Sequence, residues 1–227
     1  MRSLRKWILS IVGCVTFALA ITLTFADTLN QPIISTEKLT NKISGWALVH
    51  ALQQGGYVLY IRHTATNQNQ EDHPKVQFAH CNTQRNLSDK GRKQAQTIGQ
   101  AFKVLHIRVE RVITSPYCRC VDTAVGIFGR GHYTLSKKLV YLIGSRPKDR
   151  VPRTQYLRQL LGTIPVTGKN IVIVGHTANL KEAAGIWPKQ EGVMIVFKPK
   201  GNGQFHFVAS ILPSQWKRLM VVGTKVR

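Results

Sequence analysis

The stretch Tyr57-Val58-Leu59-Tyr60-Ile61-Arg62-His63-Thr64 decides the fold that we predict. It begins with an unbroken apolar and aromatic run, which is typical of a strand buried on both faces of a mostly parallel sheet. Arg62 and His63 follow at the carboxyl end of this strand. In open α/β sheets, ligands bind beyond the carboxyl ends of the strands, so this pair predicts an anion-binding or nucleophilic site. Taken alone, however, an Arg-His pair at a strand end is better explained as a surface feature.

The rest of the chain alternates strands and helices, which indicates an α/β domain. Two further buried strands are predicted, and the second of them leads directly into Gly175-His176, as the first leads into Arg62-His63. Two runs joined across Gly201-Asn202-Gly203 predict an antiparallel hairpin that extends the sheet. We expect helices over residues 46–53, 88–104, 116–128, 152–161 and 179–186, and strands over 57–62, 109–114, 139–142, 171–174, 193–198 and 204–211.

The composition indicates a globular domain that acts on anionic molecules. The chain has 227 residues and a hydrophobic fraction of 43%, enough for one packed core. Its formal net charge of +22 implies an anionic partner, such as nucleic acid, a phosphorylated sugar or an anionic envelope surface.

The amino-terminal residues narrow these alternatives. Residues 1–26 combine basic residues, the apolar run 7–25 and a small-residue end, which predicts a cleaved signal peptide and a periplasmic protein. The apolar run is long, so an uncleaved membrane anchor is the alternative interpretation. Export argues against nucleic acid as the partner. We divide the remaining chain into a linker over 27–44, a domain over 45–212 and a basic C-terminal tail over 213–227.

Four motifs occur in order along the predicted domain. They are Arg62-His63, Leu87-Ser88-x-x-Gly91-x-x-Gln94-Ala95 at the start of a helix, Ser115-Pro116-x-x-Arg119, and Gly175-His176. Together they resemble the histidine phosphatase superfamily, whose fold is called phosphoglycerate-mutase-like. The resemblance implies a three-layer α/β/α domain with a mostly parallel sheet. The cysteines near these motifs resemble those of exported bacterial members.

The resemblance also assigns roles to the residues in the motifs. His63 is the nucleophile that forms a phosphohistidine, Arg62 and Arg119 bind the phosphoryl oxygens, and His176 is a further donor. These roles agree with the chemistry, since a neutral imidazole attacks phosphorus and guanidinium groups match phosphate oxygens. Asn69 lies where many relatives carry a phosphate-pocket asparagine. We expect no cofactor.

Departures from the family pattern concern the acid that protonates the leaving group. Thr177 stands where one branch of the superfamily has an acid after the second histidine, and we expect it to bind the substrate. Glu191 immediately precedes the strand predicted over 193–198. If this strand runs antiparallel to those ending at His63 and His176, Glu191 lies on the catalytic edge and is our candidate acid. Asp72, on the loop after His63, is the second candidate for the acid, and a solvated turn glutamate is an equally good interpretation of Glu191.

Cysteine use agrees with export. Without Cys14 the chain has three cysteines, which suggests one disulfide and one free thiol in an oxidising compartment. Cys81 precedes the Leu-Ser helix and Cys118 precedes Arg119, so we expect these two to pair. A zinc site with His80 is the alternative, but the Cys-x-Cys spacing suits tetrahedral zinc poorly, and we predict no metal.

The sequence therefore predicts an exported phosphomonoesterase. Its expected substrate is a phosphorylated small molecule or glycan, for which related exported proteins suggest lipopolysaccharide core sugars. A non-catalytic phosphate-binding envelope protein and a protein phosphohistidine phosphatase are the two alternatives.

Overall fold

The computed structural model describes residues 34–35 and 40–224, which lie in one compact unit, Ile33–Arg227. The signal segment predicted over residues 1–26 and most of the predicted linker lie outside the described residues. In the described ranges, no helix has both the length and the apolar character needed to span a membrane.

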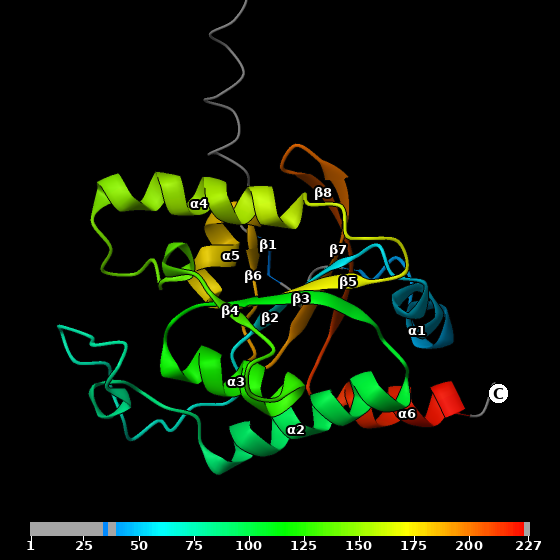
Figure 1. Cartoon of the computed structure of the whole chain (residues 1–227), viewed down its shortest axis with the longest axis horizontal. Helices are drawn as coiled ribbons and strands as arrows, with labels where there is room; N and C mark the ends of the chain where they lie inside the picture. Colours follow the sequence, from blue (N-terminus) through cyan, green and yellow to red (C-terminus); the bar gives the residue numbers. More distant parts are fainter. Residues whose placement is uncertain (1–33, 36–39, 225–227) are drawn as a thin grey trace, which may run out of the picture. The chain divides into compact units, whose positions relative to one another are not determined.

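A six-stranded sheet forms the centre of the domain (Figure 1). The strands lie in the order β4-β3-β5-β2-β7-β8, where β4, β3, β5 and β2 are parallel and β7 and β8 form the antiparallel end. The predicted hairpin and the mostly parallel sheet are therefore confirmed. The strand bounds are β2 Val58–Arg62, β3 Val109–Thr114, β4 Thr134–Leu135, β5 Asn170–Gly175, β7 Met194–Gly201 and β8 Gln204–Ile211.

Helices cover both faces of the sheet, which gives the predicted three layers (Figure 1). One face packs against α1 (Gly45–Gln54), α2 (Asp89–Val104), α3 (Cys118–Phe128) and α6 (Gln215–Thr224). The other packs against α4 (Pro147–Leu161) and α5 (Thr177–Ala184). Strand β2 alternates between the two: Leu59 and Ile61 belong to the first core, and Val58 and Tyr60 to the second.

Helix α2 begins where its sequence motif predicts. The hydroxyl of Ser88 accepts a hydrogen bond from the backbone N–H of Gly91, which caps the helix. Gly91 is required for a second reason, because a Cβ atom there would clash with the carbonyl oxygen of Ala65. The missing side chain lets the helix approach the chain just beyond His63.

The strand predicted over residues 139–142 is wrong. The segment instead forms a 3₁₀ turn, η4 (Lys137–Leu139), followed by irregular chain. Leu139 and Leu142 are buried as the apolar pattern requires, but the polar backbone is satisfied by the side chain of Asn179. This amide accepts from the N–H of Leu142 and donates to the carbonyl of Val140, so no neighbouring strand is needed.

Both ends of the described chain pack more closely than the sequence indicated. Ile34–Ser35 in the predicted linker forms β1, which pairs in parallel with β6 (Ile186–Trp187). The residues that we named a basic tail form helix α6, which buries Trp216 completely. The packed unit therefore extends beyond residue 212, the boundary that we predicted.

Candidate active site

The topology brings three predicted site residues to one edge of the sheet. β2 and β5 are parallel neighbours, with Arg62 paired with Gly175, so His63 and His176 leave the sheet side by side. Their rings are 5.6 Å apart between centroids. β7 runs antiparallel to β2, so its start returns to the same edge, and the N–H of Gly192 donates to the carbonyl of His63 at 2.9 Å. This places Glu191 at the edge, as the predicted strand direction requires.

His63 is a buried, neutral imidazole with a defined tautomer. Its Nδ1 lies 3.0 Å from the carbonyl oxygen of Thr64, which can only accept, so Nδ1 carries the proton and Nε2 keeps a lone pair. Burial, and after it the charge of Arg119, lowers the pKa of His63 well below 6.5. An unprotonated Nε2 is the form of histidine that can attack phosphorus.

The chain after His63 is held by the helices of the predicted motifs. The N–H of Thr64 donates to the hydroxyl of Thr123 on α3 at 3.0 Å. The N–H of Ala65 donates to the side chain of Gln94 on α2, and the hydroxyl of Ser88 donates to the Ala65 carbonyl. The Ser-x-x-Gly-x-x-Gln spacing therefore serves to fix the backbone beside the nucleophile.

His176 is fixed by neighbours on every side. Its Nε2 is 2.9 Å from the hydroxyl of Ser115, and its ring packs against the rings of Tyr117 and Tyr141. Burial first, and then the charge of Arg119, lowers the pKa of His176 well below 6.5. Cys120 lies 3.6 Å from Nε2, but burial raises the pKa of this thiol to about 12, so it remains protonated and is not a nucleophile.

Arg119 is the most deeply buried charge of the site, with a relative exposure of 1%. Its guanidinium lies over the ring of Tyr117, 4.3 Å from the centroid. Asp72 binds it with both carboxylate oxygens, at 2.8 and 3.1 Å. The Nε atom is buried and has no hydrogen-bond partner among the described residues.

Arg62 and Glu191 form a second charged pair beside His63. One Nη of Arg62 donates to the carbonyls of Pro188 and Lys189, and the other lies 3.5 Å from Glu191. Burial lowers the pKa of Arg62, and the nearby Glu191 opposes this shift. Glu191 accepts hydrogen bonds from the hydroxyl and the N–H of Thr66 and lies 3.9 Å from Nδ1 of His63.

Arg85 is a site residue that the sequence analysis missed. Its charge is the smallest of the causes that lower the pKa of His63 and of His176, and its backbone carbonyl accepts a hydrogen bond from Nη1 of Arg119 at 3.3 Å. Its Nε is buried without a hydrogen-bond partner in the described part of the chain, like those of Arg62 and Arg119. Arg85 stands in the predicted loop before Leu87, where neither periodicity nor spacing distinguishes it from the neighbouring polar residues.

Asn69 and Thr177 are less closely tied to this cluster. Asn69 is exposed, and its backbone N–H donates to the side chain of Asn67. Thr177 is buried at the start of α5, directly after His176.

A disulfide joins Cys81 to Cys118, the pair that we expected, while Cys120 is a free buried thiol. Within the described residues, no group of His, Cys, Asp and Glu side chains is arranged to hold a metal ion.

Comparison with known proteins agrees with this geometry. Residues 58–138 match the model of the histidine phosphatase superfamily (branch 1), whereas no curated protein matches the sequence. Among solved structures, the fold is similar to that of the protein histidine phosphatase SixA complexed with tungstate. The TM-score is 0.51 at 14% identity, over 70% of this chain and 98% of that chain.

Two other similar structures are phosphatases by name. A mycobacterial glucosyl-3-phosphoglycerate phosphatase gives a TM-score of 0.48 at 13% identity, over 68% of this chain and all of its own (100%). The phosphoserine phosphatase of Entamoeba histolytica gives 0.46 at 17% identity, over 69% and 96%. The family model therefore matches the part of the chain that contains β2, α2 and α3, and the fold as a whole is similar to that of a protein histidine phosphatase.

Proposed function

We propose that the protein hydrolyses phosphomonoesters through a phosphohistidine formed on Nε2 of His63. The observation that carries this proposal is the hydrogen bond between Nδ1 of His63 and the Thr64 carbonyl, because it leaves Nε2 unprotonated. A buried imidazole with a low pKa remains a nucleophile at neutral and mildly acidic pH.

The reaction takes place in two displacements. In the first, Nε2 forms a bond to phosphorus, the bond to the ester oxygen breaks, and that oxygen leaves and takes up a proton. In the second, water attacks phosphorus, the N–P bond breaks, and inorganic phosphate leaves while a proton is released. Arg62, Arg85 and Arg119 would stabilise the charge on the phosphoryl oxygens in both steps.

The position of Glu191 supports a role different from the predicted leaving-group acid. Its carboxylate approaches Nδ1, whereas a leaving group departs from phosphorus on the Nε2 side of the ring. When phosphorus bonds to Nε2, the imidazole gains positive charge, and a carboxylate behind the ring would stabilise it. We therefore propose that Glu191 is the counter-charge of the phosphohistidine.

An anionic envelope component, such as a phosphorylated core sugar, is the substrate class that we propose. The features of residues 1–26 support export, and the disulfide between Cys81 and Cys118 suits an oxidising compartment. The net charge of +22 suits a substrate on an anionic surface.

The test is turnover of 4-nitrophenyl phosphate by the wild-type chain and by a His63→Asn variant, followed by a screen of phosphorylated sugars and envelope fractions. We expect release of inorganic phosphate by the wild type only. Phosphate binding without turnover would overturn the proposal in favour of a binding protein.

A further inference from the structure

We propose that Asp72 is a positioning residue that holds Arg119 so that one edge of its guanidinium faces the phosphoryl group. This inference rests on the proposed phosphatase function and concerns how its most buried arginine is aligned. No motif of the sequence assigned such a role to Asp72.

The hydrogen bonds of Arg119 show which edge is left. A guanidinium has five N–H donors in one plane. Asp72 takes one donor from each Nη, and the carbonyl of Arg85 takes a second donor from Nη1 at 3.3 Å. The Nε–H and the second Nη2–H remain, and these two point in the same direction.

The geometry of this remaining edge suits the binding of a phosphoryl group. Two parallel N–H groups match two oxygens of a phosphoryl group, as they match the oxygens of a carboxylate. The Nε of Arg119 is buried and without a partner among the described residues, and a buried donor without an acceptor is unfavourable. An anionic ligand would supply the acceptor.

Tyr117 and Asp72 together fix the orientation of the guanidinium. Stacking on the ring of Tyr117 sets its plane, and the same ring contacts the edge of His176. Stacking alone leaves rotation within that plane free. The two oxygens of Asp72 on the Nη1–Nη2 edge remove this freedom, so the neighbouring Nε–Nη2 edge has a defined direction.

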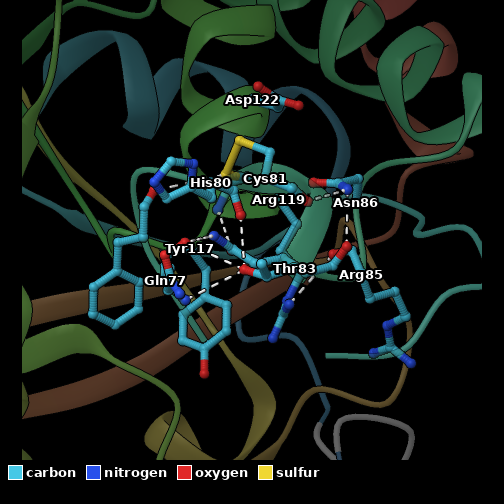
Figure 2. The surroundings of a disulfide bond; sticks show 12 residues. Gln77, His80, Cys81, Thr83, Arg85, Asn86, Tyr117, Arg119 and Asp122 are labelled. Carbon is cyan, nitrogen blue, oxygen red and sulfur yellow. Dashed lines mark hydrogen bonds between the residues drawn. A yellow bond between two sulfur atoms is a disulfide. The ribbon is translucent and has the colours of Figure 1, made fainter. Parts of the chain in front are cut away.

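Asp72 is itself held against the end of its loop. The backbone N–H of Arg85 donates to Oδ1 at 2.9 Å, and the N–H of His73 donates to the carbonyl of Thr83. In Figure 2, Arg119 lies near the disulfide of Cys81, which joins this loop to Cys118, the first residue of α3. The loop that carries Asp72 and the helix that carries Arg119 are therefore covalently linked.

The experiment is a double-mutant cycle with Asp72→Asn and Arg119→Lys, measured as kcat and KM on 4-nitrophenyl phosphate. The asparagine amide would keep one acceptor but lose the charged two-oxygen contact. For Asp72→Asn alone we expect kcat to fall by roughly 10- to 100-fold, the cost of misaligning a group by about 1 Å. KM should change by less than about threefold, because lost alignment is offset by the loss of a negative charge beside the phosphate.

Lysine has no planar edge to align, so Asp72→Asn should change kcat by less than about threefold in the Arg119→Lys background. Asp122→Asn is the matched control. Asp122 lies one turn beyond Arg119 on α3, and its carboxylate is 3.1 Å from the exposed Arg92. Loss of the Asp122 charge should leave kcat unchanged.

Equal losses in both backgrounds would overturn the inference, because Asp72 would then act independently of Arg119, for example as an acid that touches the substrate. If the wild type shows no turnover, the proposed function fails by itself. The same cycle is then measured on the binding of inorganic phosphate, where additive effects of the two substitutions would overturn the positioning role.

Discussion

The Nδ1 atom of His63 lies 3.0 Å from the carbonyl oxygen of Thr64, the next residue in the chain, and this contact fixes Nε2 as the reactive nitrogen. The contact depends on a backbone that is itself fixed, since Thr64 and Ala65 are held by α3 and α2. The nucleophile is therefore prepared by residues from three separate segments of the chain, the end of β2, α2 and α3.

The first prediction concerns the site of phosphorylation. Rapid quenching during turnover should trap an acid-labile phosphate on His63, and NMR of the isolated peptide should place it on Nε2. His63→Asn should abolish both turnover and trapping. Phosphate on Nδ1, or a variant that retains most of the rate, would contradict the mechanism.

The second prediction concerns Arg85, whose carbonyl contacts Arg119 and whose charge helps to lower the pKa of both histidines, yet which belongs to none of the four motifs. Arg85→Gln should lower kcat/KM by about 10²-fold, since one lost charged donor costs at least about 2 kcal/mol of transition-state stabilisation. Arg92→Gln removes an exposed arginine and is the control. Similar small effects of both substitutions would exclude Arg85 from the site.

The third prediction concerns stability in acid. Because the folded-state pKa values of His63 and His176 lie well below 6.5, the unfolded chain binds protons there before the folded chain does. The contribution of these two histidines to the free energy of unfolding is fully present above about pH 6.5. It is lost as the pH falls below that value, by up to about 1.4 kcal/mol per pH unit for each histidine. Denaturant unfolding at pH 7.5, 6.5 and 5.5 measures this slope.

His176→Gln removes one of the two groups. The slope of the free energy of unfolding against pH, measured between pH 6.5 and 5.5, should therefore correspond to about one proton fewer taken up on unfolding. This comparison uses the slope, so any loss of absolute stability in the variant does not affect it. An unchanged slope would show that His176 is not held neutral in the folded protein.

The fourth prediction concerns the disulfide, which links residues separated by 37 positions. Replacing Cys81 and Cys118 with serine should lower the free energy of unfolding by about 3–4 kcal/mol in the chain-entropy model. The same variant should lose activity, because the loop that holds Asp72 is no longer fixed to α3. Peptide mapping of the wild type, isolated without reductant, should find both cysteines in one cross-linked fragment. Full activity in the serine variant would show that the disulfide is not needed to align Arg119.

The sequence predicted the parts of this site that follow buried strands. The apolar runs before His63 and His176 could belong only to the interior of the sheet, and parallel strands must end at one edge. Glu191 was placed by the same argument, from the direction of the strand that follows it. All three residues lie where these patterns predicted.

The contacts made by the loop could not be predicted in this way. Asp72 and Arg119 are 47 residues apart, and no local pattern connects a loop aspartate with an arginine on a helix. Arg85 is likewise placed by the folding of residues 64–86, which are polar and have no period. The irregular segment after η4 was mistaken for a strand because an Asn179 side chain takes the place of backbone partners.

The last prediction separates the two roles of Glu191. A leaving-group acid would matter far more for an alkyl phosphate, whose oxygen needs a proton, than for an aryl phosphate, whose oxygen does not. A counter-charge to the phosphohistidine would matter equally for both, because the imidazole gains the same positive charge. From the 3.9 Å approach of Glu191 to Nδ1, we expect Glu191→Gln to lower kcat by a similar factor on 4-nitrophenyl phosphate and on an alkyl phosphate. Glu182→Gln, which breaks an exposed pair with Arg150, is the control. A much greater loss on the alkyl substrate would restore Glu191 as the acid, and no loss on either would leave it a structural partner of Thr66.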